Sequence, residues 1–297
     1  IIATVEPSLE VYDILNGKLL WKYYLKETKF NKNRYGGKRY DYSGGNPWGG
    51  ISADINRGIV YVTTGNAGFY FDGVNRPGNN KFSNSIIAID IFNKKKIWDF
   101  QEIAHDIWNL DIPAPPILTS ISKNNKKIDV VVAVTKLGNT IILDRLTGEP
   151  IFDFHKKKAP RSKIPGEKTA YYQPKLVIPE PFSKQFFSIN EVTNISKESE
   201  NYIKNKIKNA NFGFFQPHEL GKENIFFGFH GGAEWMGGSV NNNKGIMYIT
   251  SHNIPWITSI YKSKKKFSYY NYENKSKRLF DKNGYPGSKP PWGTLTS

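Results

Sequence analysis

GNPWGGISADINRGIVYVTTGN, residues 45–66, and GAEWMGGSVNNNKGIMYITSHN, residues 232–253, are two copies of one pattern in a chain of 297 residues. Each copy has a Trp ten residues before a Gly and eighteen before an Asn, with no gap; the two Trp residues are Trp48 and Trp235. In each copy a polar turn separates two short segments, the second of which alternates in hydrophobicity. This arrangement is typical of a β-hairpin.

A second repeat lies between these copies. Its members are LEVYDILNGKLLW, IIAIDIFNKKKIW and TIILDRLTGEPIF, at residues 9–21, 86–98 and 140–152. In each member an apolar strand ends at an Asp, a turn follows, and a second strand closes on an aromatic residue; the three Asp residues are Asp13, Asp90 and Asp144. Repeated hairpins with periodic aromatics predict an all-β propeller of antiparallel four-stranded blades, because each blade needs neighbours to bury its faces.

Two stretches interrupt the repeats. Residues 153–225 are rich in Lys, Pro and Phe, and a short polar helix is predicted within them over residues 192–209. We interpret this stretch as a long excursion from one partial propeller domain spanning residues 1–297. Residues 261–282 are predicted to form a second, Lys-rich loop. Both ends of the chain are expected to lie inside a longer propeller, because the last residues have the pattern of a strand.

The composition narrows the class of protein. A net charge of +16 is compatible with a basic module that binds nucleic acid or anionic surfaces. No recognition helix and no aromatic-basic RNA motif accompanies it, so we favour a solvated Lys-rich surface and no nucleic-acid partner. The absence of Cys excludes disulfides, thiolate metal sites and covalently attached haem c. No apolar stretch approaches the ~20 residues of a membrane helix, so no span is predicted.

The four histidines considered as ligands do not have the spacing of a metal site; they are His155, His218, His230 and His252. We interpret them as surface or packing residues. His252, next to Asn253 in the second copy of the first repeat, is the one expected to face a central funnel.

Seven segments, in the same order, resemble the pyrroloquinoline quinone (PQQ)-dependent alcohol and sugar dehydrogenases. They are GGNPWGGISAD (44–54), YVTTGN (61–66), NRPGNNKFSNSIIAID (75–90), HDIWNLDIPAPP (105–116), KLGNTIILDRLTGEP (136–150), GGAEWMGG (231–238) and GYPGSKPPWGTLT (284–296). Each segment alone is weakly specific, and the ordered set is strong. The resemblance implies an incomplete eight-bladed β-propeller of which this chain supplies middle blades.

The same resemblance implies a chemistry. Members of the family oxidise an alcohol, polyol or sugar by hydride transfer to PQQ, which is held with Ca²⁺ or a lanthanide ion. Electrons then pass to a quinone or cytochrome acceptor, and the expected location is the periplasm. The family's upstream Glu metal ligand has no counterpart in this sequence.

The resemblance assigns three site residues. Trp48 matches the Trp beneath the planar quinone, where a flat indole offers a large stacking area. Asn66 matches an Asn whose side-chain oxygen binds the metal ion. Lys136 matches the cation beside the quinone oxygens, where it stabilises developing negative charge. The residues alone leave open a blade-core Trp, a turn Asn and an exposed turn Lys, and Trp235 is interpreted as structural.

Asn109 is where the sequence departs from the family. That position is normally the Asp that accepts the alcohol proton, and an amide cannot accept a proton at neutral pH. A non-catalytic or decayed propeller scaffold is therefore the alternative to an enzyme. Asp111 matches the extra metal ligand of lanthanide-using members. In an extended strand it would face the same side as Asn109, and a solvated loop carboxylate is the alternative for Asp111.

Overall fold

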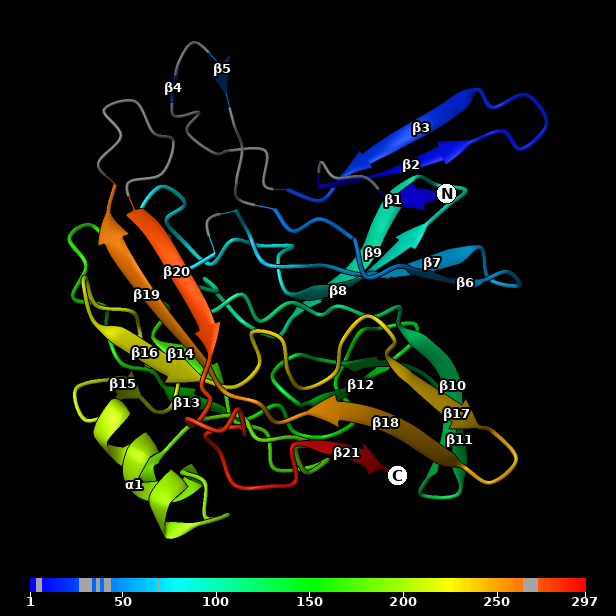
Figure 1. Ribbon diagram of the computed structural model, residues 1–297. Helices are drawn as coiled ribbons and strands as arrows, with labels where there is room; N and C mark the ends of the chain where they lie inside the picture. The colour runs from blue at the N-terminus through cyan, green and yellow to red at the C-terminus, as the bar shows by residue number, and fades with distance from the viewer. Residues whose placement is uncertain (4–6, 27–33, 36–37, 40–43, 69, 264–271) are drawn as a thin grey trace.

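The computed structural model of the protein describes residues 1–3, 7–26, 34–35, 38–39, 44–68, 70–263 and 272–297. Regular structure in these ranges is mostly β-strand, with one α-helix and one 3₁₀ turn. All but one of the strand pairs within the sheets are antiparallel, so the predicted all-β antiparallel architecture is confirmed (Figure 1). No helix among the described residues is long and apolar enough to cross a membrane.

The repeats form successive sheets. The first copy of the Trp repeat and the second member of the Asp repeat together make a complete four-stranded blade in the order β6-β7-β8-β9. Its strands are β6 (Ile51–Asp54), β7 (Ile59–Thr63), β8 (Ser85–Asp90) and β9 (Lys95–Gln101). The sheet before it contains β1 (Ile2–Ala3), β2 (Ser8–Tyr12) and β3 (Leu19–Tyr24). The sheet after it contains β10 (Ile117–Lys123), β11 (Lys126–Val134) and β12 (Thr140–Asp144).

Strand β7 shows why these sheets stack. All five of its residues are buried, and successive side chains leave opposite faces of the blade. Ile59 and Tyr61 pack with residues of β11 and β12, whereas Val60 and Val62 pack with Leu9 of β2. The blade is therefore covered on both faces by its neighbours, as a propeller requires.

The Asp residues of the second repeat share one local role. One carboxylate oxygen of each accepts hydrogen bonds from the backbone amides two and three residues later in the turn; these residues are Asp13, Asp90 and Asp144. An Asp that hydrogen-bonds its own turn in this way fixes the hairpin.

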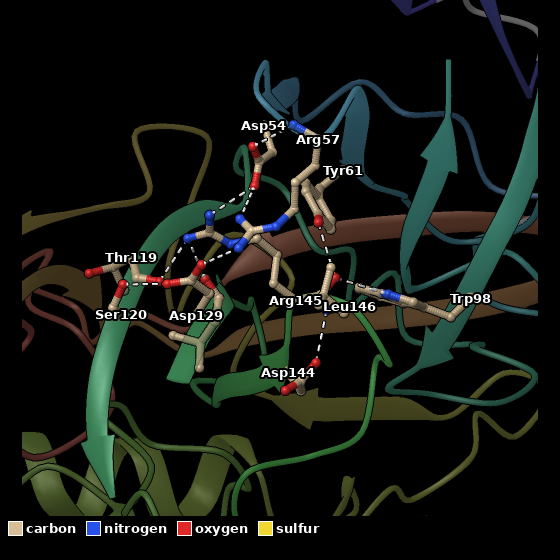
Figure 2. Close-up of polar contacts among 11 residues, drawn as sticks. Asp54, Arg57, Tyr61, Trp98, Thr119, Ser120, Asp129, Asp144, Arg145 and Leu146 are labelled. Carbon is tan, nitrogen blue, oxygen red and sulfur yellow. Dashed lines mark hydrogen bonds and ion pairs between the residues drawn. The ribbon is translucent and has the colours of Figure 1, made fainter. Parts of the chain in front are cut away.

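A polar contact joins the second and third sheets (Figure 2). The Asp54 carboxylate at the end of β6 accepts from Arg57 at 2.7 Å and from Arg145, just after β12, at 3.1 Å. Arg57 also pairs with Asp129 of β11 at 2.6 Å. The indole of Trp98 on β9 donates to the Arg145 carbonyl oxygen at 3.2 Å. The two blades are thus held together by charge at their edges and by apolar side chains between them.

The second copy of the Trp repeat forms another sheet, of β17 (Gly238–Asn241), β18 (Ile246–His252) and β21 (Gly293–Thr296). Between β18 and β21 the chain makes a hairpin of β19 (Trp256–Lys262) and β20 (Tyr272–Arg278). The prediction of a loop over residues 261–282 is therefore wrong for 261–262 and 272–278, while 264–271 lie outside the described residues. Strand β20 is an edge strand with mostly exposed polar side chains, so it lacks the apolar alternation that identifies a strand.

Residues 153–225 contain the short hairpin of β13 (Lys156–Lys158) and β14 (Tyr172–Pro174), then η1 (Ile189–Glu191), α1 (Lys197–Lys206) and β15 (Asn211–Phe212). They also include most of β16 (Glu223–Phe226), which ends one residue later. The predicted polar helix is confirmed, with a shorter extent because Ser196 caps it by accepting from the amide of Ser199. Strand β16 pairs with β19, so this stretch joins the same sheet as the later hairpin, and β15 is parallel to β16 (Figure 1). A separate short ladder pairs β4 (Arg34–Tyr35) with β5 (Lys38–Arg39). A single domain over the whole chain stays a prediction.

Candidate functional site

Trp48 lies in the turn just before β6, with 43% of its surface exposed, so it is not a blade-core residue. Its indole Nε1 donates to Asp111 Oδ2 at 2.7 Å. Gly65 lies against both groups: a Cβ there would fall 2.5 Å from Asp111 Oδ2 and 2.8 Å from the indole nitrogen. The end of the first repeat, with Asn66 next in sequence, is therefore packed directly on the Trp48–Asp111 contact.

Lys136 lies between β11 and β12 and is 5% exposed, so the alternative of an exposed turn lysine is wrong. Its Nζ is 5.8 Å from the Trp48 ring centroid and 3.4 Å from the Asn109 carbonyl oxygen. Its backbone amide donates to the Asp111 carbonyl oxygen at 3.3 Å. No carboxylate in the described part of the chain forms an ion pair with this ammonium group. A cation held in this way is suited to stabilise an electron-rich oxygen beside it.

The segment that carries Asn109 is a turn, so the expectation that Asn109 and Asp111 share one side of a strand is wrong. The buried Asp106 carboxylate accepts from the backbone amides of Trp108 and Leu110, each at 2.7 Å, and this bends the chain. Burial raises the pKa of Asp106. Asn109 has φ +58°, in the left-handed region that Asn tolerates better than most residues.

Asp111 is 6% exposed, so the alternative of a solvated loop carboxylate is also wrong. Its Oδ1 is buried without a hydrogen-bond partner, and the side-chain nitrogen of Asn66 is buried in the same condition. Among the described residues, no three His, Asp or Glu side chains gather as metal ligands. The oxygens of Asn66 and Asp111 are the type of donor that Ca²⁺ and lanthanide ions take, so these residues fit a hard cation.

Glu234 belongs to this site and was not predicted from the sequence. Gly232 is pressed against the Lys136 carbonyl oxygen, and the amide of Ala233 donates to the Thr135 carbonyl oxygen at 3.1 Å. This contact carries Glu234 next to Lys136, where its Oε1 is buried without a partner. Burial raises the pKa of Glu234 to about 7; Lys136 opposes this rise and Asp111 adds to it. The sequence contained one signal for Glu234: it is a charged residue in a Gly-rich segment, directly before the Trp of the repeat.

The remaining candidates lie elsewhere. Trp235 is 70% exposed, so the expected packing role is not seen. His218 is fully buried beside the Thr258 hydroxyl at 2.6 Å, and burial lowers the pKa of His218 to about 3. His155 and His252 are exposed. His230 is also exposed and lies against Trp256, with 4.6 Å between ring centroids and the two planes tilted by 36°.

Solved structures share this architecture. The chain is similar to a europium-containing methanol dehydrogenase, with a TM-score of 0.58 and 20% sequence identity over 97% of this chain and 47% of that one. At this identity the likeness shows the fold alone.

Curated proteins are similar in sequence. The glycerol dehydrogenase large subunit of Gluconobacter thailandicus is 27% identical over 86% of this chain and 35% of its own length. The quinate/shikimate dehydrogenase (quinone) of Acinetobacter baylyi is 23% identical over 97% of this chain and 39% of its own length. This chain thus spans little more than a third of either relative.

The family model described as PQQ, glucose/ethanol/alcohol dehydrogenase, beta-propeller domain, matches residues 5–297. The match covers the Trp48 turn, the Asn109 turn, Lys136 and the Glu234 loop, which are the segments that meet in the structure. The chain therefore belongs to the PQQ-dependent glucose/ethanol/alcohol dehydrogenase family of β-propellers.

Proposed function

We propose that this chain forms part of the cofactor site of a dehydrogenase that oxidises an alcohol, polyol or sugar by hydride transfer to PQQ. The observation that carries the proposal is the meeting of Trp48, Asp111 and Lys136, which come from segments far apart in the sequence. Three different chemical groups come together here. They are a partly exposed indole, a buried carboxylate oxygen without a partner, and a buried ammonium group. A cluster that only packs the protein interior would not require a stacking face, a free acceptor and a cation together, so this combination favours a binding site.

Each residue has a role in the proposal. The Trp48 indole stacks against the planar ring system of the cofactor. Lys136 would donate a hydrogen bond to the quinone oxygens of the cofactor and stabilise the negative charge that develops on them. Asn66 and Asp111 donate oxygen ligands to Ca²⁺ or a lanthanide ion, and the negative charge on Asp111 favours the ion of higher charge. Bound PQQ supplies the two-electron acceptor.

A non-catalytic or decayed propeller is the second candidate, and Asn109 is the observation that favours it. The side chain at this position is an amide, which cannot take the proton of a substrate hydroxyl. A site that binds the cofactor and lacks its proton acceptor would hold PQQ and metal with little turnover.

The proposed substrate is a small alcohol, polyol or sugar, and the proposed electron acceptor is a quinone or a cytochrome. The names of the relatives support this range, since one acts on glycerol and another on quinate or shikimate with a quinone. A periplasmic location completes the proposal and rests on the family resemblance.

Two tryptophans at the same position of the repeat provide the test. PQQ binding is measured by absorbance and equilibrium dialysis with Ca²⁺ or La³⁺, using the full chain with any flanking segments that its gene encodes. Trp48→Ala is expected to weaken PQQ binding about tenfold or more, because it removes a stacking face. Trp235→Ala removes an equal side chain that is 70% exposed, and is expected to leave the affinity unchanged. Absence of PQQ binding to the unaltered protein with either metal would overturn the proposal.

A further inference from the structure

We propose that His230, Trp256 and Arg278 form a carboxylate-binding shelf beside Lys136, and that the substrate is a polyhydroxy carboxylate. The shelf deepens the proposed function and rests on it, because the hydroxyl group to be oxidised would lie toward Lys136 and Trp48. The carboxylate would lie at the outer end, against Arg278.

The shelf is built on the hairpin of β19 and β20, which lies next to β16 (Figure 1). Trp256, the first residue of β19, is the direct cross-strand partner of Arg278, the last residue of β20. The guanidinium carbon is 5.6 Å from the Trp256 ring centroid. The imidazole of His230 meets the same indole at 4.6 Å between centroids, with an angle of 36° between the planes. The indole of Trp256 therefore contacts two side chains that can donate hydrogen bonds, those of His230 and Arg278.

The loop that carries His230 connects this shelf to the candidate site. A Cβ at Gly228 would lie 3.0 Å from the Lys136 carbonyl oxygen, and one at Gly232 would overlap that oxygen. His230 lies between these two glycines, so its backbone is fixed against Lys136. The five residues are thus linked by neighbouring contacts. Lys136 lies beside the Trp48 ring, the loop of His230 packs on the Lys136 backbone, and Trp256 contacts both His230 and Arg278.

The electrostatics of the shelf favour an anion. Burial lowers the pKa of His230 first, and Lys136 and Arg278 lower it further, so both cations act on the same ring. Across the described ranges of the chain, neither Lys136 nor Arg278 forms an ion pair. Lys277, next to Arg278, instead pairs with Glu223 at 3.2 Å. Among the described residues Arg278 is therefore left without an ion-pair partner, whereas Lys277 is neutralised by Glu223. Glu234 lies beside Lys136 and offsets part of the charge at the inner end of the shelf.

The groups present match a carboxylate joined to a polyol. Arginine offers a planar fork that binds a carboxylate through two parallel hydrogen bonds. An indole face is suited to the C–H surface of a sugar or cyclitol. PQQ also carries carboxylates, so the carboxylate bound by the shelf could belong either to the substrate or to the cofactor. The substrate is favoured because Arg278 and His230 are exposed, whereas Lys136, which lies 5.8 Å from the Trp48 ring centroid, is buried.

The test compares Arg278→Gln with Lys275→Gln. Both residues are exposed cations on β20, and Lys275 lies over Tyr261, away from the shelf. The probes are two matched pairs, gluconate with sorbitol and quinate with its methyl ester. Their binding to the cofactor-free protein is measured by calorimetry at one fixed low ionic strength, and KM is measured for the PQQ-loaded protein. We expect at least one acid to bind better than its neutral partner, and Arg278→Gln to reduce that preference about tenfold.

The other results are equally informative. Equal binding of acid and neutral partner in both pairs overturns the shelf, as does an equal effect of Lys275→Gln. Weaker PQQ loading in Arg278→Gln, with unchanged acid binding, assigns the shelf to the cofactor and overturns the substrate class. If the unaltered protein fails to bind PQQ while acid binding still depends on Arg278, the proposed function is wrong, and the carboxylate-binding role of the shelf is still supported.

Discussion

At the scale of single residues, the proposed function depends most on Asn109, where the family resemblance implies a proton-accepting Asp. Its backbone is held at φ +58° by the turn that Asp106 organises, and its carbonyl oxygen contacts Lys136. Asp also tolerates the left-handed region, so Asn109→Asp should fold without new strain. If only the proton acceptor is missing, this variant should gain about 10²–10⁴-fold in kcat.

The measurement is steady-state oxidation of glycerol, glucose and quinate by the PQQ-loaded protein, with PQQ affinity determined in parallel. Asn109→Ser serves as the control, because it also removes the amide and adds no carboxylate. Unchanged turnover in Asn109→Asp, with intact PQQ binding, would favour the non-catalytic propeller.

The sequence singles out Trp48, Asp111 and Lys136, which meet in the structure, because these residues belong to recognisable local patterns. Trp48 and Asn66 occupy fixed positions in the repeat, and Asp111 and Lys136 lie in segments that resemble a known family. Glu234 was missed because its burial comes from the packing of its loop on Lys136, which is almost one hundred residues earlier in the chain. Sequence spacing carries no information about such a contact.

At the scale of elements, the turns of the three Asp-repeat hairpins share one backbone conformation and differ in how closely they are packed, so they separate the effect of backbone strain from that of packing. The residue four positions after the Asp has positive φ in each: Gly17 at +69°, Lys94 at +56° and Gly148 at +75°. A Cβ at Gly17 would have no atom within 4 Å, whereas one at Gly148 would lie 2.5 Å from the ring of Trp98 on the preceding blade.

These turns predict a graded effect on stability. Gly17→Ala should reduce the free energy of unfolding by about 1 kcal/mol, the cost of positive φ for an L-residue. Gly148→Ala should reduce it by about 2–4 kcal/mol, because it also displaces a packed indole. Lys94→Gly should be neutral or slightly stabilising. Urea unfolding checks all three, and equal losses at Gly17 and Gly148 would show that Trp98 does not lock the two blades.

The element scale also shows which strands a sequence can reveal. The hairpins of the repeats were predicted because each joins two strand-like segments through a turn with recognisable Asp or Gly residues. Strand β20 was missed because an edge strand with polar side chains has no apolar period. The pairing of β16 with β19 was missed because it joins two segments at least thirty residues apart that share no local motif.

At the scale of the whole molecule, carboxyl groups that burial disfavours in the charged form lie in several loops between the strands. Burial raises the pKa of Glu102 to about 8, of Glu234 to about 7 and of Asp72 to about 6. Each of these groups binds its proton more tightly in the folded chain than in the unfolded chain. Between the unfolded and folded pKa values the folded state holds more protons, so stability falls as pH rises. The metal-free protein should therefore be more stable at pH 5.5 than at pH 8.5.

Glu102 should contribute most to this loss. Its Oε1 accepts from the Thr135 hydroxyl at 3.0 Å and from the Asn139 amide at 2.8 Å, while its Oε2 is buried without a partner. Glu102→Gln keeps an acceptor for both donors and cannot ionise, so it should remove several kcal/mol of the pH dependence between about pH 4.5 and 8. Urea unfolding at pH 5.5 and 8.5 provides the measurement, and Glu149→Gln is the control because it removes the same charge from an exposed position. If Glu102→Gln and Glu149→Gln change the pH dependence equally, the effect belongs to the net charge of +16 and not to a buried carboxyl group between blades.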